Sequence, residues 1–186
     1  LDKSTALKAT PPPEPKRKKI NLKILWEDEA ILVVDKPTGL LSIATDRLED
    51  DTLHSRCVDY VRQEDENNWC HIVHRLDRDT SGVMVFARHK RHKEYLQSQF
   101  AERAVYRSYH ALVEGRPKNN NGTRKDWLVE DKHLRVKKVK STFHGSKEAI
   151  THWEIADTDN QVSLIQISID TGRRHQIRIA MMSLEC

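Results

Sequence analysis

Segments with the pattern of β-strands recur along this chain, and they limit the folds that it can form. One such segment places five residues on a single strand face, because they occupy every second position: Val105, Arg107, Tyr109, Ala111 and Val113. Other strand-like segments are residues 22–26, 31–35, 83–87, 150–155 and 162–169, and Leu134 and Val136 begin a further alternating run. Short turns join residues 22–26 to 31–35 and residues 150–155 to 162–169, which predicts hairpins in an antiparallel or mixed sheet.

Three segments have the apolar spacing of helices. Asp51 or Thr52 can cap the first, whose apolar residues fall on one face: Leu53, Cys57, Val58 and Val61. The second is expected over residues 91–101, where it would bury Tyr95, Leu96 and Phe100. The third is expected over residues 175–184, with Thr171 as its candidate cap. Together with the strands, these helices predict a single α+β domain with a mixed, largely antiparallel sheet flanked by helices.

The chain divides into a short tail and one domain. Residues 1–20 combine a proline-rich stretch with four consecutive basic residues and lack apolar periodicity, so we expect a disordered tail. Residues 21–186 are expected to form the domain, and residues 119–122, three asparagines and a glycine, are expected to be a loop tip. A content of 37% hydrophobic and 32% charged residues fits a globular protein.

The sequence has no signal for export or for membrane insertion. No apolar segment is long enough to cross a membrane, and the first residues lack the apolar core of a signal peptide. The cysteines at positions 57, 70 and 186 leave one unpaired in any scheme and lack paired metal-ligand spacing, which suits a reducing compartment. These observations predict a cytoplasmic protein without membrane contact.

Positive charge is clustered along the chain. The net charge is only +4, but basic residues gather at 16–19, at 88–93, at Arg135 with Lys137, Lys138 and Lys140, and at 173–174. Clustered positive charge is how proteins gain affinity for phosphate backbones, although a single cluster is also typical of a solvated face.

Asp77 is the candidate catalytic residue. It lies between Arg75 and Arg78 and precedes a Ser-Gly turn and an apolar run. Nearby positive charge favours the ionised form of an acid, and an ionised carboxylate can act as a nucleophile or a general base. The alternative is a turn between two strands in which the aspartates only cap backbone amides.

The stretch from His74 to Gly82, with His-Arg-Leu-Asp followed by Thr-Ser-Gly, resembles the signature of the RluA-type pseudouridine synthases. Further matches follow the family's order: the Lys-Pro-x-Gly-Leu turn at 36–40, the segment 105–115, Lys-Glu-Ala-x-Thr at 147–151, and Thr-Gly-Arg-x-His-Gln-Ile-Arg at 171–178. The resemblance implies the pseudouridine synthase fold and the isomerisation of uridine in ribosomal or transfer RNA to pseudouridine, without a cofactor or a metal ion.

The resemblance also implies roles for particular residues. Asp77 would be the nucleophile, Arg178 would pair with it, and Tyr109 would stack on the flipped uracil and serve in proton transfer. Attack on C6 of the ring and attack on C1′ of the sugar both require an ionised, positioned aspartate. Residues expected to bind or shape the RNA site are His74, Arg75, Thr80, Arg107, Arg173 and His175.

Three other readings compete with this one. The stretch Asp77 to Thr80 is superficially similar to the Asp-x-Asp-x-Thr motif of haloacid-dehalogenase-like enzymes, but its threonine comes one position too early. Histidines at 71 and 74 and at 89 and 92 have metal-ligand spacing but no third ligand at a familiar spacing. The serious alternative is a non-catalytic RNA-binding module of the same fold, in which Asp77 would be replaceable.

The chain departs from the family at both ends. It stops soon after the His-Gln-Ile-Arg element, so we expect a catalytic domain truncated at its C-terminus, and residues 1–20 are too few for the S4-type RNA-binding domain of many relatives. Residues 179–182 differ from the family's usual Val-His after the arginine. The expected partner is a structured RNA stem-loop, bound by a monomer that needs no guide RNA.

Overall fold

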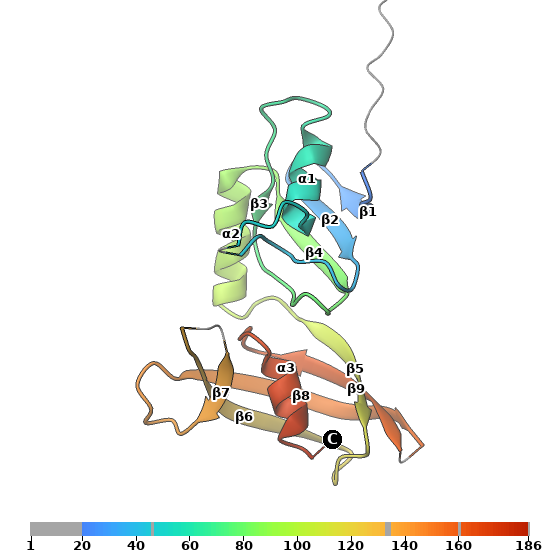
Figure 1. The fold of residues 1–186 in the computed structure, drawn as a ribbon, viewed down its shortest axis with the longest axis vertical. Coiled ribbons are helices and arrows are strands. Elements are labelled where there is room, and N and C mark those ends of the chain that lie inside the picture. The colour runs from blue at the N-terminus through green and yellow to red at the C-terminus, as the bar shows by residue number, and fades with distance from the viewer. Residues whose placement is uncertain (1–19, 46, 133–134, 160, 186) are drawn as a thin grey trace, which may run out of the picture.

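The computed structural model describes residues 20–185 except 46, 133–134 and 160 (Figure 1). The expected tail, apart from Ile20, and the start of the alternating run at Leu134 lie outside the described residues. In this part of the chain the strands form two sheets, one above the other in Figure 1, and no helix is long and apolar enough to cross a membrane.

The first sheet is built from residues near the N-terminus. Its order is β1 (Lys23–Glu27), β2 (Ile31–Lys36), β4 (Gly82–Ala87) and β3 (His71–Ile72), and all neighbours are antiparallel. The predicted hairpin of β1 and β2 is confirmed. Asp28 closes its turn by accepting the backbone N–H groups of Ala30 and Ile31, each at 2.8 Å.

Two helices pack on this sheet. Thr52 caps α1 (Leu53–Val61), and it forms a capping box with Ser55; the four predicted apolar residues of α1 are buried. The second predicted helix is also present, as α2 (Lys90–Ala101), but the expected burial of Tyr95 is wrong, because this residue is 64% exposed. Leu96 and Phe100 are half-buried, so α2 covers the sheet with a narrow apolar stripe.

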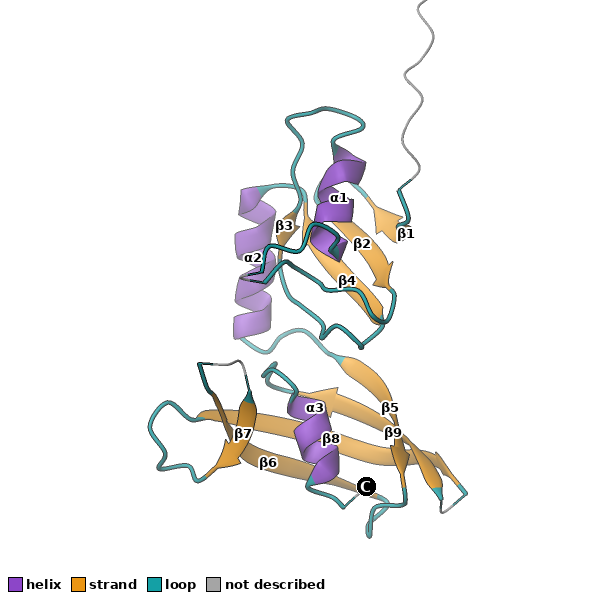
Figure 2. Ribbon diagram, in the orientation of Figure 1, coloured by secondary structure: helices purple, strands orange, loops and turns teal. Residues whose placement is uncertain are grey.

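The second sheet follows α2 in the sequence. Its order is β5 (Ser108–Glu114), β9 (Val162–Ile169), β8 (Lys147–Thr158), β6 (Asn121–Glu130) and β7 (Val136–Val139), again antiparallel throughout. Helix α3 (Gln176–Met182) packs on one face of it (Figure 2). The predicted α+β class is therefore right, while the described strands form two antiparallel sheets in place of one mixed sheet.

Two local predictions are corrected by the structure. Asn121 and Gly122 begin strand β6 and do not lie at a loop tip. Thr171 is not the cap of α3, because His175 occupies that position in the left-handed conformation, with φ +54°. The Thr171 hydroxyl instead donates to Gln176 Oε1 at 2.8 Å and accepts the Ile150 N–H at 2.9 Å, so it fixes the loop before the helix.

Each sheet has its own hydrophobic core. The first core includes Leu32, Val34 and Phe86 with the apolar face of α1, and the second includes Trp153 and the buried isoleucines of β9 with Ala180 and Met181 of α3. Tyr109 is half-buried and packs against both cores. It therefore lies where the two halves of the molecule meet.

Candidate active site

The loop that carries Asp77 is fixed by a turn from another part of the chain. It connects β3 to β4, and the Asp77 side chain is 24% exposed. Ser42 Oγ donates to the Leu76 carbonyl at 2.7 Å and accepts the Leu76 N–H at 3.1 Å. Thr38 Oγ1 donates to the Asp79 carbonyl at 3.0 Å. The Lys-Pro-x-Gly-Leu turn and the residues after it thus hold the backbone on both sides of Asp77.

Lys36 is the centre of this arrangement. It is fully buried, and its Nζ donates to the carbonyls of Leu40, Arg78 and Pro37 at 2.6, 2.8 and 2.9 Å. Burial lowers the pKa of Lys36, and the negative charges of Asp79 and Asp77 oppose that shift. One buried ammonium therefore joins the turn to the loop and supplies positive charge beneath the two aspartates. Lys36 was not among the residues predicted from the sequence, although it lies in a matched motif.

The second half of the molecule supplies the residues that face Asp77. His175 Nε2 lies 3.9 Å from Asp77 Oδ2. Arg178, one turn further along α3, lies 4.0 Å from Asp79 Oδ2 and forms no ion pair with Asp77 among the described residues, contrary to the expected pairing. The arginine and the histidine are thus brought to the Asp77 loop together, but each contacts a different aspartate.

Gln176 fixes the segment that presents His175 and Arg178. Its Oε1 accepts the Thr171 hydroxyl and the Arg173 N–H, and its Nε2 donates to Ile150 O at 2.9 Å and to Thr151 Oγ1 at 3.0 Å. The side chain is buried; the bonds that Oε1 accepts hold the loop itself, and the bonds that Nε2 donates join it to β8. Gln176 was also missed in the sequence, where only its place in the His-Gln-Ile-Arg element marks it.

Tyr109 reaches the same region from β5. Burial raises the pKa of its phenol, and the negative charge of Asp77 adds to the shift, while Arg107 opposes it. Its hydroxyl therefore stays protonated at neutral pH and is available as a proton donor.

His74 and Arg107 form a packed cluster beside Tyr109. The His74 ring stacks on Phe100 at 4.9 Å, and its Nε2 accepts the Val85 N–H at 3.1 Å. Burial, with the positive charge of Arg107, lowers the pKa of His74 to about 4, so the ring is neutral. Arg107 lies over Phe100 and donates to the Asp170 carbonyl at 2.8 Å. His74 thus joins its loop to α2 and to β4.

The remaining predicted site residues lie in the same two loops as Asp77 and His175. Arg75 is exposed, Thr80 is half-buried, and Arg173 Nε donates to the Glu148 carbonyl at 3.1 Å. Within the described residues, no group of three or more His, Cys, Asp or Glu side chains is arranged to hold a metal ion. The rings of His89 and His92 contact each other edge to face.

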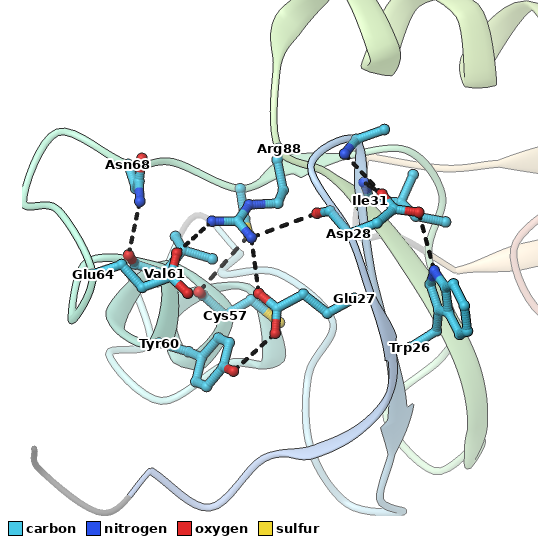
Figure 3. Close-up of polar contacts among 12 residues, drawn as sticks. Trp26, Glu27, Asp28, Ile31, Cys57, Tyr60, Val61, Glu64, Asn68 and Arg88 are labelled. Atoms are coloured by element: carbon cyan, nitrogen blue, oxygen red, sulfur yellow. Dashed lines mark hydrogen bonds and ion pairs between the residues drawn. The ribbon is translucent and has the colours of Figure 1, made fainter.

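A cavity of about 480 Å³ lies elsewhere, between the β1–β2 turn and the start of α2. Its wall includes Glu27, Glu64 and Arg88. Figure 3 shows Arg88 between the two glutamates. Arg88 lies 2.9 Å from Glu27 and 2.6 Å from Glu64, and the Tyr60 hydroxyl donates to Glu27 at 2.9 Å. Because these charges are paired with one another and none adjoins Asp77, we assign the cluster to holding β1, α1 and β4 together.

Known proteins resemble this chain over most of its length. The family model described as RNA pseudouridylate synthase matches residues 30–183. Among relatives, the Vibrio cholerae dual-specificity RNA pseudouridine synthase RluA is 33% identical over 162 residues, and the match covers 87% of this chain and 63% of that protein. The Borreliella burgdorferi ribosomal large subunit pseudouridine synthase D is 32% identical over 170 residues, which cover 89% of this chain and 52% of that protein.

A solved structure shares the fold. Human RNA pseudouridylate synthase domain containing 4 superposes with a TM-score of 0.73 at 24% identity, covering 88% of this chain and 64% of that chain.

The Bacillus subtilis protein named uncharacterized RNA pseudouridine synthase YhcT is a further relative by sequence. It is 31% identical over 165 residues, which cover 88% of this chain and 54% of that protein. The chain therefore spans between half and about two thirds of the length of these relatives.

Proposed function

This chain belongs to the RluA-type RNA pseudouridine synthase family, and from that premise we propose that it isomerises uridine in RNA to pseudouridine. In this reaction the bond from C1′ of the ribose to N1 of uracil breaks, the base turns, a bond forms from C1′ to C5, the proton on C5 leaves, and N1 takes up a proton. No atom is gained or lost overall, so the protein has to supply a nucleophile, a proton acceptor and an enclosed site.

The observation that carries the proposal is the fixed position of Asp77 opposite the second half of the molecule. We propose Asp77 as the nucleophile, because its loop is held by Lys36, Ser42 and Thr38 and its carboxylate faces His175. A pre-positioned carboxylate loses little entropy on reaching the reacting carbon. The target base would leave its stack to reach this site, and its contacts there would offset the free energy of unpairing.

Tyr109 and Arg178 would assist this carboxylate. The neutral phenol of Tyr109 would stack on the uracil and move a proton at the end of the reaction. Arg178 would act on the loop through Asp79, which it approaches in this structure, and its exposure leaves it free to reach the substrate as well.

The remaining site residues would hold the RNA. Arg75, Arg107 and Arg173 would contact phosphates, with Thr80 and His175 beside the nucleotide and His74 supporting the loop. The proposed substrate is a stem-loop of ribosomal or transfer RNA, recognised by a monomer without a guide RNA. The unpaired thiols of Cys57 and Cys70 support a reducing, cytoplasmic setting.

Tritium release from RNA labelled at C5 of uridine tests the proposal. The purified protein is compared with Asp77→Asn and with Asp59→Asn, a control change at an exposed aspartate of α1. We expect release from the parent and from Asp59→Asn, and a loss of at least about a thousandfold in Asp77→Asn. A folded protein that binds RNA but releases no tritium from a total RNA pool would favour the binding-module alternative.

A further inference from the structure

Positive charge is concentrated in one short part of this chain, residues 132–147, here called the basic segment. It holds six basic residues and no Asp or Glu: Lys132, Arg135, Lys137, Lys138, Lys140 and Lys147. The basic segment thus carries +6 and residues 1–19 carry +4, in a chain whose total is +4. All other residues together carry −6, so the basic segment is a positive region on an otherwise acidic body.

The fold leaves most of this charge unpaired. Among the described residues, only Lys138 of these cations forms an ion pair: it turns toward α3 and lies 2.8 Å from Asp126, whose side chain is 4% exposed. Of the carboxylates next to the segment, Asp131 accepts the backbone N–H of Arg135 at 3.0 Å, Glu130 pairs with Arg174, and Glu148 pairs with Lys125 and Arg103.

The five other cations are exposed and form no ion pair with any described residue: Lys132, Arg135, Lys137, Lys140 and Lys147. They lie on β7, the edge strand of the second sheet, on the connections before and after it, and at the start of β8 (Figure 1).

A fixed turn within the segment presents an aromatic ring to solvent. The Phe143 N–H donates to the Lys140 carbonyl at 3.0 Å, the Ser146 N–H donates to the Phe143 carbonyl at 3.1 Å, and Gly145 takes the required positive φ of +77°. Phe143 is 53% exposed despite its apolar side chain. An exposed aromatic ring between cations is the combination with which proteins bind an unpaired base and its phosphates.

The basic segment borders the Asp77 site. Arg173 donates to the carbonyl of Glu148, the residue after Lys147, and Arg174 pairs with Glu130 at 3.3 Å, near the start of β7. His175, the next residue, lies 3.9 Å from Asp77. The loop before α3 thus contacts Glu130 and Glu148, which flank the basic segment, on one side and Asp77 on the other.

We propose that the basic segment binds the strand of the substrate RNA that flanks the target uridine, with phosphates on Lys137, Lys140 and Lys147 and an unpaired base on Phe143. The proposal rests on the proposed function for the identity of the ligand as RNA. It adds a second contact region outside the Asp77 site, and this region sets affinity and leaves the chemical step unchanged.

The test measures binding of a fluorescent RNA stem-loop with uridines in its loop, by anisotropy across a series of KCl concentrations. The variant Lys137→Glu/Lys140→Glu/Lys147→Glu is compared with Arg62→Glu/Arg116→Glu/Lys118→Glu, which reverses three exposed cations outside every basic cluster. We expect the first to bind at least tenfold more weakly, with the slope of log affinity against log salt lowered by about 2. The control should bind within about twofold of the parent.

Two further readouts separate the proposed roles. Phe143→Ala should weaken binding about tenfold, while Phe143→Tyr, which keeps a ring, should not. At saturating RNA, the tritium-release kcat of the basic-segment triple variant should equal that of the parent, with a raised KM. Unchanged melting temperatures verify that the variants are folded.

An unchanged affinity and salt slope in the basic-segment variant would overturn the proposal, as would an equal loss in the control. Loss of kcat without a change in affinity would also overturn it. These outcomes are distinct from failure of the proposed function: a protein that binds RNA through the basic segment yet releases no tritium supports this surface and refutes the enzyme, and the reverse pattern does the opposite.

Discussion

At the scale of single residues, the buried charge of Lys36 fixes the backbone around the candidate site. A buried ammonium is costly unless its donors are satisfied, and Lys36 meets that condition with three backbone carbonyls. The carbonyls belong to the turn after β2 and to the loop that carries Asp77, so the same bonds that satisfy the charge also fix the loop.

We predict that Lys36→Ala lowers the free energy of unfolding by about 3 kcal/mol, because it leaves the carbonyls of Leu40 and Arg78 without their donor. Lys23→Ala is the control, since Lys23 forms an exposed pair with Asp35 and should cost less than about 1 kcal/mol. Urea unfolding of the three proteins makes the comparison. Equal losses in the two variants would contradict the role given to Lys36.

His74 predicts a pH dependence of stability. Its pKa is lowered to about 4 in the folded protein by burial and by Arg107, whereas the unfolded chain has the ordinary value of 6.5. Between these values the unfolded state binds more protons, so stability is full above about pH 6.5 and falls as the pH drops toward about 4. The loss due to His74 should be about 2 kcal/mol between about pH 7 and pH 5.

Urea unfolding of the parent and His74→Gln at the two pH values isolates this contribution, because the glutamine amide oxygen can accept a hydrogen bond and does not titrate. Burial also lowers the pKa of His71, which gives the parent a second dependence of the same sign. The difference between parent and variant is therefore the quantity to compare. An identical pH dependence in both proteins would be inconsistent with a buried, neutral His74.

At the scale of elements, the sequence was informative where local pattern and burial agree. The β1–β2 hairpin and helix α1 could be predicted because an acidic turn and a threonine cap bound clear apolar patterns. Strand β6 could not, because its inward-facing positions include Arg124 and Asp126, which pair with each other at 3.3 Å and remove the apolar alternation. Strand β3 has only two residues, too few for any pattern.

The loop between β9 and α3 has a steric requirement that can be tested. A methyl group on Gly172 would lie 2.9 Å from Arg107 Nη1, the flexible end of a side chain. We predict that Gly172→Ala displaces the Arg107 guanidinium with little loss of stability, so its melting temperature stays within about 2 °C of the parent. Because Arg107 is proposed to contact RNA, KM should rise severalfold. Arg107→Ala in the same background should then cause little further change, whereas additive losses would separate the two residues.

At the scale of the whole molecule, the site depends on the meeting of two sheets. Asp77 belongs to the first half, and Tyr109, His175 and Arg178 belong to the second. Motif order in the sequence predicted that these residues act together, but pairing across the junction depends on how the halves pack. In this structure the carboxylate beside Arg178 is that of Asp79, two residues along the loop from Asp77, the partner that the resemblance implies.

Tyr109 tests this junction, since it packs against both cores. We predict that Tyr109→Phe retains the packing and stays within about 0.5 kcal/mol of the parent, while tritium release falls at least about a hundredfold because the hydroxyl that would pass on the proton from C5 is lost. Tyr109→Leu should lower both activity and the free energy of unfolding, the latter by about 2 kcal/mol. Full activity in Tyr109→Phe would exclude the phenol from proton transfer and leave only stacking.

The two sheets also differ in when they can form during synthesis. Among the described strands, β1 to β4 form the first sheet and β5 to β9 the second, so each sheet comes from its own part of the chain. Since domains on a growing chain fold as units from the N-terminus, the first sheet can close while the second is still inside the ribosome. Asp77 is then already in place on the nascent chain, but Tyr109 and the residues of α3 that face it have not yet emerged. A half-made chain thus carries the carboxylate without the residues that face it, and the complete site arises only when synthesis has reached α3.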